Sequence, residues 1–355
     1  MTQATPFRHD FKETTGVLLT NLGTPASASR ADVRRFLREF LGDPRVVEVP
    51  RLPWWLILNG IILNTRPGRS AKAYAKIWQD DGSPLMSISV RQAEALQNAL
   101  AERDIVVELA MRYGKPAIAD GLLRLKQRGA TRILVLPLYP QYSATTTATT
   151  FDAVAQAMKK ERRIPELRFV NHYHDEPGYI DALADSVRSY RQQHGSAEKL
   201  VMSFHGIPQD YFDKGDPYYC ECQKTARLLA ERLGLGVEEW MVTFQSRLGP
   251  KQWLQPYTDT SLEELGAEGV KSVQVICPGF SVDCLETLEE IAMENRDVFL
   301  ESGGERYEYI PCLNDDPLHI TMMKTLVLQH IRGWPESHED AAMRLTRARS
   351  GGAKA

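Results

Sequence analysis

The 355-residue sequence lacks the features that mark several specialised classes of protein. No apolar run reaches the ~18–20 residues needed to cross a bilayer, and no N-terminal apolar stretch follows a basic region as it does in a secretory signal. We therefore expect a cytoplasmic protein. The formal net charge of -3 is nearly balanced, which argues against nucleic acid as a partner.

Cysteine is scarce, with five residues, an odd number that falls late in the chain. Such a set does not build a disulfide framework and fits a reducing compartment. The tighter metal motifs are missing as well: there is no HExxH, no pair of CxxC motifs and no two-histidine-one-carboxylate set that the sequence alone assigns. We therefore expect any bound metal to be held weakly.

Signatures of nucleotide binding and of serine hydrolases are also absent. No GxGxxG or GxxxxGKS follows a predicted strand, and the single glycine in NLGTP, at 21–25, is more typical of a tight turn than of a phosphate site. There is no GxSxG elbow to supply a nucleophilic serine. Histidine is the best remaining candidate for chemistry.

What the chain does contain is an alternation of short apolar runs and longer stretches with helical periodicity. This pattern is typical of parallel sheets covered by helices, so we expect an α/β fold. The length favours two domains, and the two similar halves meet near 165–170. The predicted strands are 16–21, 106–113 and 133–140 in the first half and 199–205, 239–245 and 272–280 in the second.

His205 ends the predicted strand 199–205, and a GIP turn follows it. A lone histidine at a strand end is more often a structural residue, but open α/β folds bind ligands at this edge of the sheet. Downstream, the stretch 278–295 places Asp283, Glu286 and Glu290 at i, i+3 and i+7, which predicts one helical face. That face is either a solvated surface or part of the same crevice. Imidazole and carboxylates together suit divalent iron, and imidazole accepts protons near neutral pH.

Several blocks of this sequence, in order from about residue 14 to 330, resemble the ferrochelatase family, which inserts ferrous iron into protoporphyrin in the last step of heme synthesis. The resemblance implies two Rossmann-like, doubly wound domains around a porphyrin cleft, at 14–165 and 166–332. The remaining stretch, 333–355, lacks sustained apolar periodicity and ends in small and basic residues, so we expect a disordered tail there. The resemblance also implies iron(II) and protoporphyrin IX as substrates and protoheme and two protons as products. The blocks are NLGTP, MRYG, LPLYPQYSATTT, LVMSFHGIP, DKGDPYY, TFQSRLGPKQWLQPYTD and CPGFSVDCLETLEEI.

The same resemblance assigns roles to individual positions. It implies that His205 and Glu286 are the catalytic pair that handles the metal, and that Asp283 and Glu290 form an acidic metal path behind them. Six further positions are implied to surround the porphyrin, although core packing or a surface ion pair is the alternative for each. These are Tyr139, Gln245 and Trp253 around the ring, Arg112 beside them, and Arg66 and Ser83 near the propionates.

The chain departs from the animal members of the family at its cysteines. Ala144 stands where the animal enzymes have a cysteine, and the tail has none. We therefore expect no iron–sulfur cluster and no permanently bound cofactor, with iron only as a substrate. Cys284 stands where other members carry histidine, which argues against a metal-relay role at this position. The other four cysteines are Cys220, Cys222, Cys277 and Cys312.

The stretch 51–69, RLPWWLILNGIILNTRPGR, is apolar with arginine flanks but too short to span a membrane. It is either a buried helix or loop, or a hydrophobic lip at the cleft mouth that touches a membrane surface. The resemblance favours the lip and hence a peripheral contact at the inner membrane face. Two other functions stay open: a chelatase for another metal or ring, such as cobalt or coproporphyrin, and a non-catalytic tetrapyrrole-binding protein.

Overall fold

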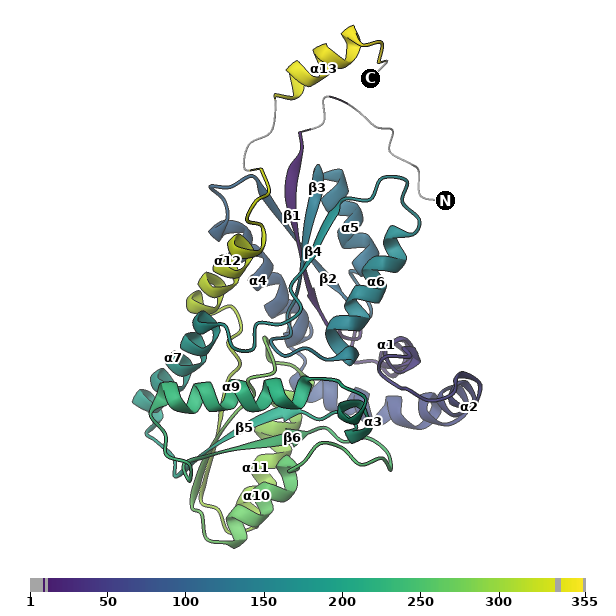
Figure 1. The fold of residues 1–355 in the computed structure, drawn as a ribbon. Coiled ribbons are helices and arrows are strands. Elements are labelled where there is room, and N and C mark those ends of the chain that lie inside the picture. Colours follow the sequence, from purple (N-terminus) through teal and green to yellow (C-terminus); the bar gives the residue numbers. More distant parts are fainter. Residues whose placement is uncertain (1–8, 10–11, 336–339, 354–355) are drawn as a thin grey trace.

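A computed structural model describes residues 9, 12–335 and 340–353 of the chain. Two four-stranded, fully parallel sheets form its frame, one in each half (Figure 1). The first sheet, in the order β2-β1-β3-β4, contains β1 (Thr14–Asn21), β2 (Ile105–Met111), β3 (Ala130–Pro137) and β4 (Glu166–Phe169). The second, in the order β6-β5-β7-β8, contains β5 (Lys199–His205), β6 (Trp240–Gln245), β7 (Ser272–Ile276) and β8 (Arg306–Ile310). The strand order is the same in both halves, so the predicted pair of similar α/β units is confirmed.

Helices connect and cover the strands. Those of the first half are α1 (Arg30–Gly42), α2 (Arg51–Ile57), η1 (Leu58–Ile62), α3 (Leu63–Ile77), α4 (Pro84–Ala99), α5 (Ile118–Gln127), η2 (Ala144–Ala148) and α6 (Thr149–Met158). Those of the second half are α7 (Pro177–His194), α8 (Gln209–Asp213), α9 (Tyr218–Leu233), α10 (Thr258–Ala267), η3 (Glu286–Glu294), α11 (Asn295–Glu301) and α12 (Pro317–His330). The elements labelled η are π-helices.

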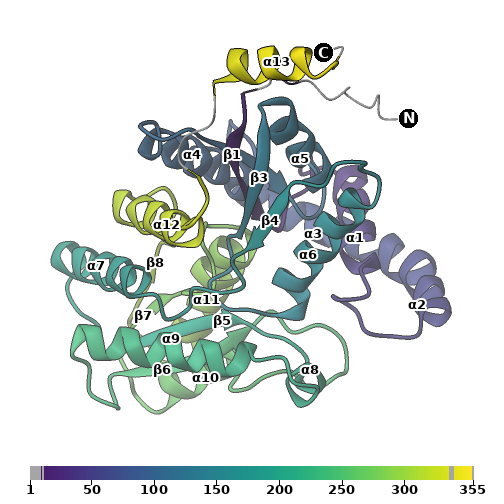
Figure 2. The same ribbon diagram turned by 45° about the horizontal axis from the view of Figure 1, so that its top comes forward.

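Successive side chains of the central strand β1 point to opposite faces of the first sheet. Leu18 packs in a cluster with residues of α5 and α6, which cover one face in both views (Figures 1 and 2). Val17 and Leu19 belong to a larger cluster that includes residues of α4, α7 and α12 and continues to Phe204 in β5. The two halves therefore share one apolar core.

The junction between the halves lies later than the sequence predicted. The expected boundary at 165 falls just before β4, and β4 pairs with β3, so 166–169 belong to the first sheet. In addition, α12 packs against α4, so the last helix before residue 333 contacts the first half of the chain (Figure 2). β4 was not predicted because ELRF is short and half charged, which is the pattern of an edge strand and not of a buried one.

The tail was predicted to be disordered from 333 onward, and this is wrong for part of it. Residues 341–350 form the helix α13 (Ala341–Ser350), whose N-terminus is capped by the Asp340 side chain accepting from the Ala342 amide at 2.7 Å. The sequence of α13 is rich in alanine and arginine, which favour helix without needing a buried face. Arg344 also forms an ion pair with Glu13 at 3.2 Å.

Candidate active site at the sheet edge

His205 is the last residue of β5 and pairs in register with Gln245, the last residue of β6. Its Nδ1 lies 2.6 Å from the carbonyl oxygen of Gly206. Because that oxygen can only accept, Nδ1 carries the proton in the neutral imidazole and the lone pair is on Nε2. The predicted place of His205 at the carboxyl edge of the sheet is confirmed.

Glycine at position 206 is required by a close approach of three segments. A Cβ there would lie 2.9 Å from the carbonyl oxygen of Gln245 and 3.2 Å from the ring of Trp253. The Gly206 amide donates to that same carbonyl at 2.7 Å. The residue after His205 is therefore clamped between β6 and Trp253, which fixes the backbone that carries the imidazole.

Gln245 links this edge to the acidic helix η3. Its Oε1 accepts from the Ser203 hydroxyl at 2.7 Å, and its Nε2 donates to the backbone carbonyl of Glu286 at 2.9 Å. Hydrogen bonds thus join Ser203 inside β5, Gln245 at the end of β6 and the first residue of η3. Gln245 therefore connects both predicted residues, since it pairs in register with His205 and bonds to the backbone of Glu286.

The side chain of Glu286 faces groups of the first half. Burial lowers the pKa of the Arg66 guanidinium, and the nearby Glu286 carboxylate opposes that shift. Burial likewise raises the pKa of Tyr74, and the charge of Glu286 adds to the rise. Arg66 and Tyr74 both lie on α3, which packs against η3. Arg66, predicted near the propionates, therefore lies within electrostatic reach of Glu286.

Glu290 lies one turn further along η3 and is held by the residue that follows β6. The Ser246 amide donates to Glu290 Oε1 at 2.7 Å and the Ser246 hydroxyl donates to Oε2. Burial raises the pKa of Glu290 to about 7, with the charges of Glu286 and Glu294 adding to the rise and the Ser246 donors opposing it. Ser246 has a φ of 67°, a strained conformation for a residue with a side chain.

The prediction of one helical face for Asp283, Glu286 and Glu290 is wrong for Asp283, because η3 begins after it. Asp283 is buried, and its Oδ1 accepts from the Tyr309 hydroxyl at 2.5 Å. Its Oδ2 accepts from the Asn314 side chain at 2.7 Å. These donors turn the carboxylate toward β8 and the segment that leads to α12, so only Glu286 and Glu290 of the predicted trio lie on η3.

Tyr139 and Trp253, predicted around the ring, are both partly buried. The Tyr139 hydroxyl is buried with no hydrogen-bond partner in the described part of the chain, and burial raises its pKa. The Trp253 indole donates to the Leu248 carbonyl at 3.0 Å. An unpaired buried hydroxyl is uncommon in a folded protein. Of the residues predicted around the ring, Tyr139 is therefore the one whose polar group most clearly lacks a hydrogen bond.

Arg112 and Ser83 are engaged with protein groups. The Arg112 Nε donates to the Thr149 hydroxyl at 2.6 Å, and its Nη2 pairs with the buried carboxylate of Asp43. Ser83 is buried and accepts from the Thr24 hydroxyl at 2.9 Å. A porphyrin contact by Arg112 or Ser83 would therefore have to replace these hydrogen bonds within the protein.

The sequence assigned no two-histidine-one-carboxylate set, but the structure brings one together from His172, His174 and Glu221. The only local signal was the HxH spacing in NHYHD, since the carboxylate comes from a helix far along the chain. None of the three belongs to β5, β6 or η3, which carry His205, Gln245 and Glu286.

The apolar stretch 51–69 forms α2, η1 and the start of α3, and much of its surface faces outward. The exposed fractions are 72% for Leu52, 60% for Trp55, 58% for Leu56 and 60% for Ile61. A buried helix is therefore ruled out for this surface, which we call the lip. No helix in the described ranges is long and apolar enough to cross a membrane.

Comparison with known proteins gives consistent matches over nearly the whole chain. The model of the ferrochelatase family matches residues 14–331. The ferrochelatase of Thioalkalivibrio sulfidiphilus is 55% identical over 354 residues, covering 98% of this chain and 96% of the relative. That of Marinobacter nauticus is 54% identical over 345 residues, covering 95% and 93%. Among solved structures, SirB from Bacillus subtilis with Fe3+ has a TM-score of 0.53 at 13% identity, covering 90% of this chain and 96% of that one, which shows a shared fold.

Proposed function

The chain belongs to the ferrochelatase family, and we propose that it inserts ferrous iron into protoporphyrin IX at the sheet edge where His205 and Glu286 meet. The enzyme is a porphyrin metal chelatase of the lyase class, acting in heme synthesis. The observation that supports the location is the bonded series from β5 through Gln245 to the backbone of Glu286. It places the backbone of Glu286 beside the strand that pairs with β5, at the ligand-binding edge of a parallel sheet.

The reaction needs proton acceptors as well as a metal path. One Fe2+ replaces two pyrrole N–H protons, so two protons must leave the ring as two Fe–N bonds form in their place. Nε2 of His205 is free to accept one of them, because Nδ1 already donates to the Gly206 carbonyl. Glu286 supplies a carboxylate as its partner. A second carboxyl, Glu290, has a pKa raised to about 7 by burial, so it exchanges protons near neutral pH.

Binding must also bend the porphyrin, because a distorted ring exposes its nitrogen lone pairs to the entering ion. Tyr139 and Trp253 offer aromatic surfaces to the macrocycle. Arg66 carries a half-buried guanidinium suited to a carboxylate such as a propionate. In the absence of porphyrin, the charge of Glu286 partly compensates that cation.

We place the lip at the entrance of the porphyrin cleft, in contact with the inner membrane face. An exposed apolar surface with arginine flanks suits the boundary between headgroups and acyl chains. Trp55→Glu should weaken sedimentation with anionic vesicles, whereas Val237→Glu, which changes an exposed apolar residue elsewhere, should not. Equal binding of both variants would remove the lip from this role.

The proposed activity is tested by mixing the purified protein anaerobically with ferrous iron and protoporphyrin IX and recording the heme spectrum. Parallel samples contain coproporphyrin III in place of protoporphyrin, or cobalt in place of iron. We expect heme to form from iron and protoporphyrin. Product from coproporphyrin alone would overturn the choice of ring, and no product from any pair would overturn the activity.

A further inference from the structure

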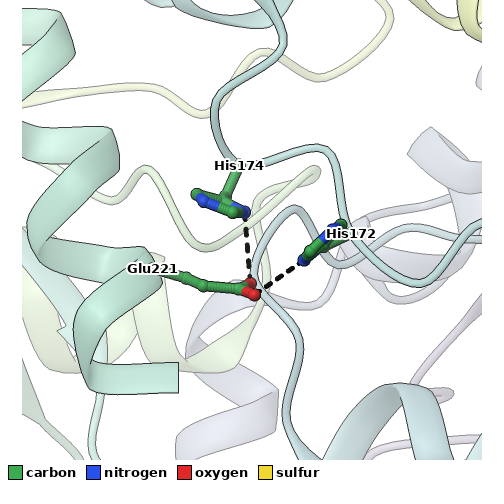
Figure 3. A group of neighbouring side chains, drawn as sticks. All are labelled: His172, His174 and Glu221. Atoms are coloured by element: carbon green, nitrogen blue, oxygen red, sulfur yellow. Dashed lines mark hydrogen bonds and ion pairs between the residues drawn. The ribbon is translucent and has the colours of Figure 1, made fainter. Parts of the chain in front are cut away.

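A second set of metal-ligand side chains lies outside the insertion site (Figure 3). His172 and His174 lie in the connection between β4 and α7, and Glu221 lies in the first turn of α9. Nδ1 of His172 is 2.7 Å from Glu221 Oε1, and Nδ1 of His174 is 3.2 Å from Oε2. One ligand atom from each of the three lies within 4.8 Å of the others. Within the described residues no other group of three or more His, Cys, Asp or Glu side chains meets this condition.

His174 is the buried histidine of the set. Its side chain is only 7% exposed, and its Nδ1 lies 3.2 Å from Glu221 Oε2 without a well-formed hydrogen bond (Figure 3). These two atoms attract each other as an ion pair only when the imidazole is protonated. A metal ion between them would instead bind both the nitrogen lone pair and the carboxylate.

Of the other two side chains, Glu221 provides a carboxylate held in place, and His172 lies where solvent can reach the set. Glu221 is 9% exposed, and its Oε2 accepts from the Tyr142 amide at 2.7 Å, which fixes the carboxylate in place. His172 is 50% exposed, so solvent reaches the set from its side. An ion can therefore enter without unfolding the segment, and water can complete its coordination.

The donor set and its spacing select a class of ion. Two imidazoles and one carboxylate suit Zn2+ and the neighbouring divalent ions of iron, cobalt and nickel, and not Mg2+ or Ca2+. Metal–ligand bonds of about 2.0–2.2 Å place adjacent donor atoms about 3–3.5 Å apart. The two separations found here differ from that range by a few tenths of an ångström or less.

We propose that His172, His174 and Glu221 bind one divalent transition-metal ion at a site separate from the insertion site. The proton that His172 now shares with Glu221 leaves as the ion takes its place. The bound ion joins three segments: the β4–α7 connection, helix α9 of the second half and, through the bond from Glu221 to the Tyr142 amide, the loop after β3. Its direct effect is to hold the two halves together beside that loop.

The test uses tag-free, metal-stripped full-length protein that carries His205→Ala and Glu286→Gln, so that the insertion site no longer contributes. Cobalt(II) chloride is titrated in without porphyrin, and visible absorption and metal content after gel filtration are measured. We expect one cobalt per chain, with d–d bands that zinc abolishes. Adding His172→Ala should weaken cobalt binding by at least the ~10–100-fold seen when metal sites lose outer-shell partners. The same expectation holds for His174→Ala.

The matched control is His194→Ala, which removes an exposed histidine at the end of α7. It should leave cobalt binding unchanged. If the three residues form only a hydrogen-bonded network, the stripped protein will retain no cobalt, or His172→Ala and His194→Ala will bind it equally, and the proposal fails. Should His174→Ala not fold, the half-exposed His172→Ala decides the outcome. Heme formation is not measured, so this result is independent of the proposed activity.

Discussion

His319 provides a test of how burial controls stability near the acidic helix. It lies fully buried in α12, and its Nδ1 donates to the Asn314 carbonyl at 2.8 Å, while Nε2 has no partner among the described residues. The Asn314 side chain in turn holds Asp283. Burial lowers the pKa of His319 from 6.5 to about 4, although the Asn314 bond and the charge of Asp316 oppose the shift.

The sign and the size follow from linkage. Because the folded protein binds this proton less readily than the unfolded chain, the stability that His319 contributes is complete above about pH 6.5 and is lost as the pH falls toward 4. With these two pKa values, the loss between about pH 7 and about pH 5 is about 2 kcal/mol. Below pH 4 the contribution stays constant.

The assay compares urea unfolding of the wild type and His319→Gln at about pH 7 and about pH 5. A glutamine amide can still donate to the Asn314 carbonyl but does not titrate, so the variant should lack about 2 kcal/mol of the acid-dependent loss. The control, His194→Gln, changes an exposed histidine and should keep the full loss. An identical loss in the wild type and His319→Gln would refute the reasoning.

Three further predictions concern the site and the cysteines. Gly206→Ala should lower the free energy of unfolding by about 1–3 kcal/mol and reduce heme formation, since its Cβ would meet the Gln245 carbonyl and the Trp253 ring; urea unfolding that matches the wild type would contradict the close approach. Glu290→Gln, and more weakly Asp283→Asn, should raise the iron concentration needed for half-maximal rate more than they change porphyrin binding; an unchanged iron dependence would count against a delivery role. Protein purified without oxygen should contain no stoichiometric iron–sulfur cluster, because the five cysteines include an exposed Cys220 and four buried thiols spread over separate elements; near-stoichiometric iron and sulfide would show this to be wrong.

The architecture could be predicted because most strands bury both faces and so read as continuous apolar runs. LVMSF in β5 and ILVLP in β3 are of this kind. Two of the four edge strands, β4 and β8, with sequences ELRF and RYEYI, carry charges on a short segment and gave no such signal. Their place in the sheets depends on pairing with β3 and β7, which only the folded chain reveals.

The position of a site residue could be predicted where a single segment determines it, and could not where contacts between several segments do. His205 could be placed because a strand end and a turn define the sheet edge. The position of Asp283 could not, because its orientation is decided by Tyr309 and Asn314 from other elements. The approach of Glu221 to His172 likewise joins residues 49 positions apart, so local spacing holds no trace of it.

The central claim, that His205 and Glu286 carry the insertion of iron, is tested most directly by the rate of heme formation in His205→Ala and Glu286→Gln. Porphyrin binding and urea unfolding are measured alongside, and His194→Ala and Glu301→Gln serve as controls on exposed positions of the same residue types. The account predicts that each site variant loses most of the activity while it folds and binds porphyrin, and that the controls match the wild type. Heme formation within a few-fold of the wild type in either site variant would contradict it.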